Sequence, residues 1–418
     1  MRKLTIIALV VLFAGAHAQP QQVVEVLAQP RPEWEVMERL FPEFERETGI
    51  RVDITYFAEL ERRSRSRLDA ASGAGQFHVY YIDEANIAEF AANDWLVPIR
   101  DYYPEEYDFD GFAQALVDVL SYDGTPYAAP ITKEGDIMFY RQDLLDEHGL
   151  AAPTTLDEYL EVVRTLHDPP RLYGTGTRGL RGSGMNVWRF SPYLHAFGGR
   201  YFDDEGNPVF NSPEAVEAVE YYIELVLHSP SPTMSWSDVM DAFAAGRIGI
   251  VTFADLKMDT LQDPERSILP GLMGFDIPPA GPEGSVSNTS VHGLAISAPG
   301  AATEAEREAA GRFIAWFTSQ ENELRKVTAG WGLTNARTAT FESDEFEAAY
   351  PAEFAEAMSG MLEVQRLTIA QIPQWGEVGD YLGIRLEELF TAAYSGQPYD
   401  VQAALDDAVE HARQALGR

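Results

Sequence analysis

The sequence predicts an α/β fold of two lobes, each built on a mainly parallel sheet flanked by helices, with a multi-segment hinge joining them. The first observation is length, because the roughly 400 residues after residue 18 exceed the ~250–300 at which a single core stops growing. The second is the alternation of short apolar runs with helical periodicity, which is typical of βαβ units. The third is a charged tract, Lys133-Glu134-Gly135-Asp136, which lies between two apolar runs. We interpret this tract as a crossing between the lobes.

The first lobe is predicted to open with strands that alternate with helices. Strands are expected at residues 23–28, 50–57 and 77–82, and helices follow each of them, the later two at about 59–71 and 84–93. In the first helix, Met37, Leu40 and Phe44 share one face, and Gly49 suits the C-cap. Pro42 lies inside this helical pattern, so we expect a kink or a short break there.

The second lobe is predicted to begin near Ile131. Its expected elements are helices at 155–166, 188–197, 213–227, 238–245, 381–394 and 401–416, a hairpin at 201–210 and a strand at 247–253. A short strand at 293–297 is the expected return crossing, and Gly330 then precedes a third crossing. The predicted lobes are therefore 19–130 plus 291–330, and 131–290 plus 331–418.

Composition limits the compartment and the partners. Arg2 and Lys3, an apolar run and Ala16-His17-Ala18 predict an export signal over residues 1–18. There is no cysteine, so neither a disulfide nor a lipid-bearing cysteine is expected, and we predict a periplasmic protein. The formal net charge of −35 excludes nucleic acid as a partner, because binding there depends on basic side chains that neutralise phosphates.

Several tracts in order resemble the family 1 extracellular solute-binding proteins, of the maltose-binding-protein type. They are FPEFERETGIRV, DGTPYAAP, FYRQDLLDEHGL, HAFGGRYFDDEGNPVFNSPEAVEAVEYY, FAAGRIGIV, RFIAWFTSQEN and AAYSGQPYDVQAALD. Within that family the chain looks most similar to the sorbitol and mannitol binders, on Leu180-Arg181-Gly182, Trp331-Gly332-Leu333 and Ile372-Pro373-Gln374-Trp375. The sequence departs from those binders at Lys133-Glu134-Gly135 and at Ser290-Val291-His292-Gly293, which leaves the ligand open.

The resemblance implies a two-lobe periplasmic-binding-protein fold whose cleft closes by hinge rotation around a sugar or sugar alcohol. It also implies a monomer, without a cofactor, that delivers its solute to the permease subunits of an ABC transporter. The alternative is a secreted carbohydrate-active hydrolase that uses cleft carboxylates, which need a separation of roughly 5–9.5 Å. Sequence alone does not show whether such a pair exists.

Sugar and polyol sites combine aromatic faces with planar charged groups that bind hydroxyls, and such groups follow several predicted strands. The candidate ligand-binding residues are Arg31, Glu59, Asp83, Glu84, Glu134, Arg181, Asn186, Trp188, Trp236, Asp255, His292, Trp331 and Trp375. Each also has a structural interpretation. Asp83 suits the N-cap of the next helix, and Glu134 could pair with Lys133 or an arginine. Arg181 and Asp255 could be ordinary surface charges, and Trp236 could lie in the core.

No catalytic residue, metal ligand or cofactor site is predicted. Gly174, Gly176 and Gly179 match the spacing of a dinucleotide-binding loop, but further glycines follow where that motif needs a helix. The eight histidines include no pair at helical i, i+4 spacing, which argues against zinc.

Overall fold

The computed structural model describes residues 22–182, 185–333 and 335–418; the predicted export signal lies outside them. Within these residues a nine-stranded sheet has the path β2-β1-β3-β10-β7-β8. The strands of this path are β1 (Gln22–Ala28), β2 (Ile50–Tyr56), β3 (Val79–Asp83), β7 (Ala128–Arg141), β8 (Ile250–Ala254) and β10 (Ser287–Ser297). Three shorter strands pair beside it, β4 (Leu96–Val97), β9 (Met273–Asp276) and β11 (Gln365–Arg366). A separate hairpin joins β5 (Ser121–Tyr122) to β6 (Thr125–Pro126).

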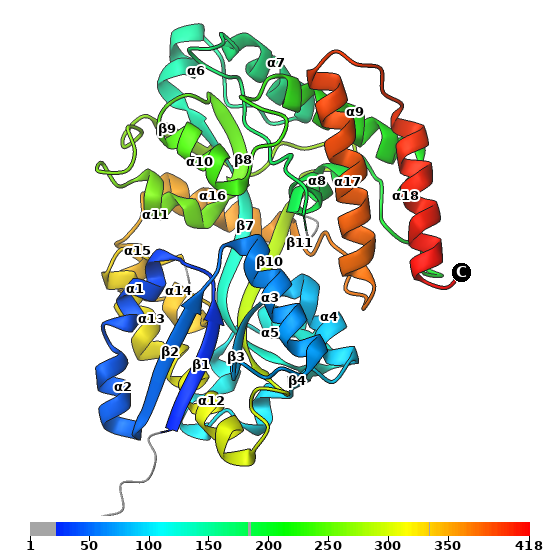
Figure 1. Cartoon of the computed structure of the whole chain (residues 1–418). Coiled ribbons are helices and arrows are strands. Elements are labelled where there is room, and N and C mark those ends of the chain that lie inside the picture. The colour runs from blue at the N-terminus through cyan, green and yellow to red at the C-terminus, as the bar shows by residue number, and fades with distance from the viewer. Residues whose placement is uncertain (1–21, 183–184, 334) are drawn as a thin grey trace, which may run out of the picture.

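Strand β7 belongs to both halves of the molecule. Its first half, from Ala128 to Gly135, pairs antiparallel with β10. From Asp136 onward its partners are β8 and β9. Figure 1 shows this strand running from the lower half of the molecule into the upper half. The tract at residues 133–136 therefore lies where the chain crosses, as its charged residues between apolar runs predicted.

Gly135 allows another segment to approach the crossing closely. A Cβ atom on this residue would lie 1.9 Å from the Sδ atom of Met361, which helix α16 (Ala352–Val364) packs against the strand. Glycine removes that clash and lets the helix cover the crossing.

The buried apolar residues fall into separate clusters on either side of the crossing. One contains residues between Val24 and Ile131 together with others from Val291 onward. Of the two remaining clusters, one consists of residues from Ile137 onward, and the other consists of residues from Met138 onward together with Ala85. Each half of the molecule thus has its own apolar interior, which is the arrangement expected of a chain of this length.

The helices of the first half surround β1, β2 and β3. They are α1 (Pro32–Glu38), α2 (Phe41–Thr48), α3 (Glu59–Ser72), α4 (Glu84–Ala92), α5 (Gln114–Val119), α12 (Glu304–Phe317), α13 (Gln320–Thr328), α14 (Thr338–Phe341) and α15 (Asp344–Glu347). The break expected at Pro42 is confirmed, because α1 ends at Glu38 and α2 starts again at Phe41. Pro42 lies in the first turn of α2, where its missing N–H has no helical partner to lose.

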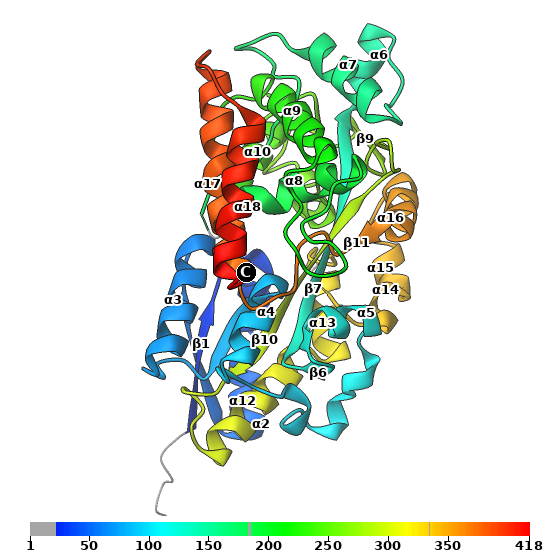
Figure 2. The same ribbon diagram turned by 90° about the vertical axis from the view of Figure 1, so that its right-hand side faces the viewer.

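The helices of the second half surround β8 and β9. They are α6 (Gln142–His148), α7 (Leu156–Leu166), α8 (Met185–Ala196), α9 (Pro213–Leu227), α10 (Trp236–Ala244), α11 (Met258–Leu261), α16, α17 (Trp375–Tyr394) and α18 (Val401–Ala415). Figure 2 shows α17 and α18 side by side along one flank of this half. Among the described helices, none combines the length and apolar character that a membrane crossing requires.

Three details differ from the sequence-based expectation. The second half is not built on a mainly parallel sheet, because β7 leaves the crossing while β8 returns to it, so their pairing is antiparallel. Among the described residues, the parallel contacts there are two isolated bridges, Tyr173 with Ile248 and Thr155 with Ala280, and the two-residue pairing of β10 with β11. The hairpin expected at 201–210 is reduced to one bridge between Phe202 and Pro208. The return strand is longer than predicted, since β10 starts at Ser287.

Candidate functional site

A pocket lies where the two halves meet, at the carboxyl ends of β1 and β3 and beside the crossing strands. The space between its atoms amounts to about 500 Å³, part of which is open to solvent. Its wall is formed by Gln29, Arg31, Glu59, Arg63, Glu134, Arg178, Trp188, Arg189, Trp236, Asn288, Ser290 and His292. We call it the interlobe pocket. Six of these residues were candidates from the sequence: Arg31, Glu59, Glu134, Trp188, Trp236 and His292.

Arg31 and Glu134 form the centre of the first network. Arg31 follows β1 at the N-cap of α1, and its Nη2 donates to Oε1 of Glu134 at 2.8 Å. Its Nη1 donates to the Tyr81 hydroxyl at 2.6 Å and lies 3.0 Å from Nδ1 of His292. Burial alone would raise the pKa of Glu134, but the charges of Arg31 and His292 hold it below its usual value. Glu134 therefore pairs with an arginine, one of its two structural alternatives, while also lining the pocket.

Asp83 lies beneath the pocket wall and holds two arginines. Both of its carboxylate oxygens accept from Nη2 of Arg62, at 2.8 and 2.7 Å, and Oδ2 accepts from Nε of Arg63 at 2.6 Å. Although burial would raise the pKa of Asp83, these arginines hold it well below its usual value. Asp83 does occupy the N-cap position of α4, but its side chain makes no cap hydrogen bond. Its contacts fix Arg63 instead.

Glu84 connects the two halves behind the pocket wall. Its Oε1 accepts from Nε1 of Trp188 on α8 at 2.9 Å and from the Ser290 hydroxyl at 3.1 Å. Its Oε2 accepts from the backbone N–H of Val291 at 3.3 Å. Burial, with the nearby charge of Asp83, raises the pKa of Glu84 to about 7. Trp188 is thereby fixed with its ring beneath the Arg63 guanidinium, 4.4 Å from the ring centre.

Glu59 forms a second contact across the pocket. Arg178 of the other half donates through Nη2 to both Glu59 oxygens, at 3.1 and 3.2 Å. Arg63 lies one helical turn from Glu59 and places its Nη2 3.0 Å from the same carboxylate. Burial alone would raise the pKa of Glu59, but Arg178 and Arg63 lower it to about 2. Glu59 is therefore an ionised bridge between the halves.

Trp236 presents the second aromatic ring of the pocket. It starts α10, whose N-cap Ser235 and Asp238 form a reciprocal capping box. The ammonium group of Lys257 lies 3.2 Å from the centre of the ring, which is a cation–π contact. Burial and the nearby Arg31 lower the pKa of Lys257 to about 7.

Besides Asp83 and Glu84, five candidate residues lie away from the pocket wall. Asp255 accepts the backbone N–H of Gly135 at 3.2 Å and so supports the crossing. Asn186 is buried and donates to the carbonyls of Gly179 and Gly383. The remaining three residues are Arg181, Trp331 and Trp375.

Arg181 is half exposed and lies 3.3 Å from Glu387. Trp331 is partly buried at another place, with the Arg266 guanidinium 5.5 Å from its ring centre. Trp375 is buried at the start of α17, with its ring centre 4.9 Å from that of Tyr201. The structure therefore does not bring these side chains to the interlobe pocket.

Sequence reasoning missed three wall arginines, Arg63, Arg178 and Arg189. Arg63 was detectable because it lies one turn beyond the candidate Glu59. Arg189 follows the candidate Trp188 directly and forms an ion pair with Asp136 of the crossing tract. Arg178 lies in the same glycine-rich segment as Arg181. The sequence analysis chose this segment but selected Arg181 in place of Arg178.

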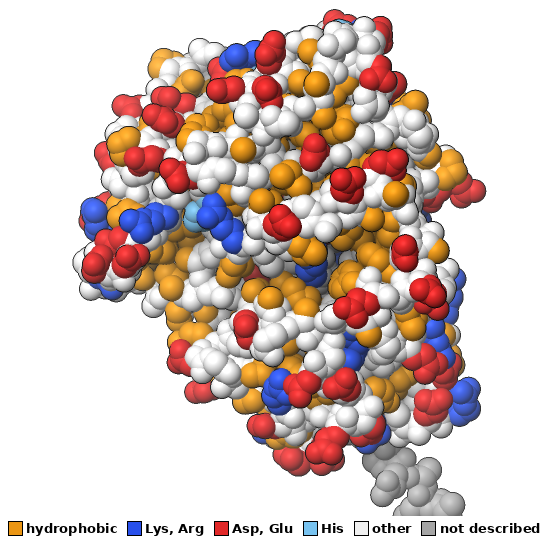
Figure 3. All heavy atoms as spheres, turned by 180° about the vertical axis from the view of Figure 1, so that it is seen from behind, with side chains coloured by type: hydrophobic (Ala, Val, Ile, Leu, Met, Phe, Trp, Pro, Cys, Tyr) orange, Lys and Arg blue, Asp and Glu red, His pale blue; other side chains and the backbone are white. Residues whose placement is uncertain are grey.

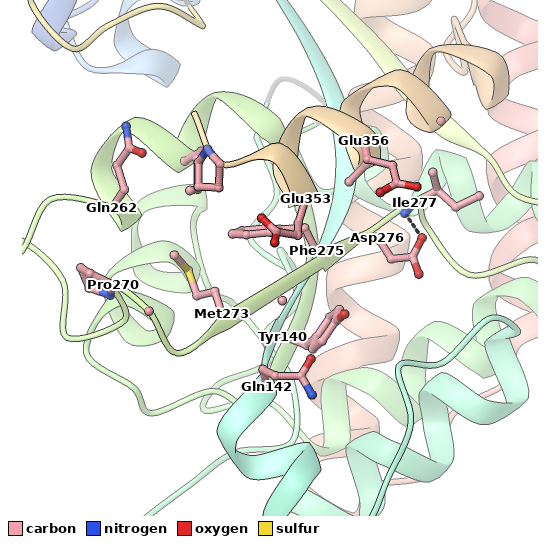
Figure 4. A pocket seen from close by; sticks show the side chains of 16 residues that line it. Tyr140, Gln142, Gln262, Pro270, Met273, Phe275, Asp276, Ile277, Glu353 and Glu356 are labelled. Atoms are coloured by element: carbon pink, nitrogen blue, oxygen red, sulfur yellow. Dashed lines mark hydrogen bonds between the residues drawn. The ribbon is translucent and has the colours of Figure 1, made fainter. Parts of the chain in front are cut away.

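A larger hollow lies along the outer edge of the second half. It is formed by β9, α16 and the loop from Gln262 to Gly271, with Glu353, Glu356 and Asp276 around it (Figure 4). It spans about 1770 Å³ and is open to solvent. Because it involves only one half of the molecule and lacks an aromatic ring facing charged donors, we assign the binding site to the interlobe pocket instead.

Comparison with known proteins identifies the family and the fold. The model for bacterial extracellular solute-binding proteins matches residues 32–324. A mannitol-binding protein of Pseudomonas aeruginosa is 27% identical over 378 residues, covering 85% of this chain and 83% of that protein. A solute-binding protein of Agrobacterium radiobacter, solved with ribitol, has a TM-score of 0.85 at 23% identity, covering 95% of this chain and all of that one. One from Agrobacterium vitis with bound D-mannitol has a TM-score of 0.82 at 24% identity, covering 95% and 98%.

Proposed function

The chain belongs to the family of bacterial extracellular solute-binding proteins, and on that premise we propose that it is the binding component of an ABC importer for a sugar or sugar alcohol. The solute enters the interlobe pocket, the lobes close over it, and the closed form delivers it to the membrane permease. The observation that carries this proposal is the pocket itself, where two tryptophan rings face charged donors and acceptors from both halves.

The comparisons support the class of solute. The mannitol-binding relative matches most of both chains, and two of the similar structures hold ribitol and D-mannitol. These ligands are small polyols, and the charged groups and tryptophan rings of the pocket wall suit a solute of that chemistry. The search for the solute of this protein should therefore begin with small polyols.

Closure requires two lobes that rotate as units, and we propose the division predicted from the sequence with one adjustment. The first two crossings lie near residues 131–137 and 286–291, where the apolar clusters change. Beyond residue 330 the chain stays with the first lobe for longer than predicted, because Arg337 donates to the Tyr103 hydroxyl and the Tyr107 carbonyl. We therefore place the third crossing between α15 and α16, and the protein in the periplasm as its export signal predicts.

The solute is released unchanged in this proposal. A hydrolase would need one pocket carboxyl that holds a proton as a general acid. Glu59 and Glu134 both have pKa values lowered by arginines, against the effect of burial, so each is an ionised carboxylate near neutral pH. Glu84 does have a pKa of about 7, but it lies behind Trp188 and already accepts three hydrogen bonds.

Thermal unfolding with a panel of sugars and sugar alcohols tests the proposal. A bound solute should raise the melting temperature by mass action and be recovered intact after hours of incubation. Failure of every carbohydrate and carbohydrate derivative to shift the melting temperature would contradict the proposed solute class, and consumption of the solute would contradict the binding role.

A further inference from the structure

Three arginines converge on the interlobe pocket from both lobes. Arg63 comes from α3 of the first lobe, Arg178 from the glycine-rich segment and Arg189 from α8 of the second. Their side chains are nearly inaccessible to solvent, between 6% and 11% exposed. Each keeps one buried N–H for which the described residues offer no acceptor: Nη1 of Arg63, Nε of Arg178 and Nε of Arg189. Buried donors normally have partners, so these three sites need an explanation.

The carboxylates near these arginines are already engaged. Asp83 is shared by Arg62 and Arg63, and Asp136 lies behind Arg189. Both oxygens of Glu59 accept from Arg178, and one of them also lies 3.0 Å from Arg63. Asp83 and Asp136 are not part of the wall, whose charged groups are four guanidiniums and two carboxylates, beside His292. The face that the pocket presents to a solute is therefore positive.

The arginines also act on one another. Burial lowers the pKa of Arg178; Glu59 opposes that effect, whereas the positive charges of Arg63 and Arg189 add to it. Neighbouring like charges destabilise one another, and an anion among them relieves that effect. Burial would also lower the pKa of Arg63 and of Arg189, but Asp83 and Glu59 raise the first and Asp136 raises the second. Arg178 is thus the arginine of the three whose charge is least compensated.

We infer that the solute of this pocket carries an oxyanion, a carboxylate or a phosphate group, beside its hydroxyls, and that Arg63, Arg178 and Arg189 bind it. This inference rests on the proposed carbohydrate-binding function and narrows its solute to acidic sugar derivatives such as aldonates, uronates or sugar phosphates. An oxyanion only accepts hydrogen bonds, which matches a cluster of unpaired donors. A neutral hydroxyl also donates a hydrogen bond and therefore needs an acceptor. The carboxylate beside these arginines, Glu59, already accepts from Arg178 through both oxygens.

The rest of the pocket suits the hydroxyl-bearing part of the solute. Glu134, Asn288 and Ser290 supply acceptors and donors, and the rings of Trp188 and Trp236 supply apolar faces. Because Arg63 belongs to one lobe and Arg178 and Arg189 to the other, an anion among them contacts both lobes. It thereby favours the closed form, since only a ligand with unequal affinity for the two forms shifts their balance.

Matched pairs of solutes test this inference on the mature protein by isothermal titration calorimetry. The pairs are ribitol and D-ribonate, D-mannitol and D-mannonate, D-glucitol and D-gluconate, and D-glucose and D-glucuronate, with D-mannitol 1-phosphate to distinguish phosphate from carboxylate. We expect the tightest acid to bind at least tenfold more tightly than the tightest neutral solute. A neutral solute that binds as tightly as any acid overturns the inference while leaving the proposed function intact. Absence of binding by every neutral and acidic solute overturns both.

Substitution of Arg178 tests the assigned contact. Arg178→Gln should lower the affinity for the tightest acid at least tenfold, and Arg178→Lys, which keeps the charge, should retain more of it. Arg164→Gln is the matched control, because Arg164 pairs with Glu224 on the surface of the same lobe. Wild-type affinity in Arg178→Gln would overturn the assignment. If Arg178→Gln does not fold, as judged by its melting temperature, two other variants replace it: Arg178→Lys and, separately, Arg63→Gln. Wild-type affinity for the acid in both of them would overturn the assignment.

Discussion

The ion pair between Glu59 and Arg178 joins the lobes, and the substitution Glu59→Gln removes its negative charge. The pKa of Glu59 is lowered from the usual 4.5 to about 2 by Arg178 and Arg63, which outweigh the effect of burial. A shift of roughly 2.5 units corresponds to about 3 kcal/mol of stability. Because the folded-state pKa lies below the unfolded value, this stability is fully present above about pH 5 and is lost as the pH falls toward 2.

The free energy of unfolding measured by urea denaturation at several pH values checks this estimate. We expect the difference between wild type and Glu59→Gln to be about 3 kcal/mol at pH 7 and to fall below half of that by pH 3. The control is Glu224→Gln, whose partner Arg164 is half exposed, so its effect should stay within about 1 kcal/mol. A difference that is the same at pH 7 and pH 3, or below about 1 kcal/mol at both, would refute the reasoning.

Two further predictions concern the groups behind the pocket wall. Asp83→Asn leaves Arg62 and Arg63 buried without their shared carboxylate, which should cost about 3–5 kcal/mol; an unchanged melting temperature would contradict this. Trp188→Phe removes the N–H that Glu84 accepts, which should cost about 1–3 kcal/mol. Since that hydrogen bond opposes the effects of burial and Asp83, the pKa of Glu84 should rise above about 7, and an infrared titration of the carboxyl band that shows no upward shift would rule this out.

The sequence predicted the architecture wherever the signal was local. The order of strands and helices, the break at Pro42 and the crossing around Glu134 all follow from periodicity, from proline geometry and from charged residues between apolar runs. The strand directions of the second half did not follow, because they depend on how β7 is shared between the lobes. The tract at residues 133–136 predicts that the chain crosses there, but nothing within residues 128–141 shows which strands will pair with its second end, or in which direction.

The pocket residues were predictable where they follow a strand. Arg31 and Glu59 come after β1 and β2, and the carboxyl ends of parallel strands meet at one edge of a sheet. Trp375 was expected in a loop because a glycine follows it, whereas the residue begins a helix. Its ring is largely buried and lines a neighbouring pocket beside Trp188 rather than the interlobe pocket.

The choice between Arg178 and Arg181 depends on contacts distant in sequence. A Cβ atom on the intervening Gly179 would lie 1.9 Å from the carbonyl oxygen of Pro232, so the backbone is pressed against another segment there. This contact fixes the backbone direction and therefore the directions in which the side chains of Arg178 and Arg181 leave it. Sequence spacing identifies the segment but not which of its arginines turns inward.

The pocket also shows how a strongly acidic chain can present a positive surface to a solute. Acidic side chains are spread over both halves of the face in Figure 3, while a patch of basic atoms lies in a recess at mid-height. Asp83 and Asp136 lie behind the pocket wall, where they form ion pairs with Arg63 and Arg189. The net charge of −35 and the positive pocket are therefore compatible. Net charge governs solubility and long-range encounter, whereas the selectivity of a buried site depends on which charges form its innermost layer.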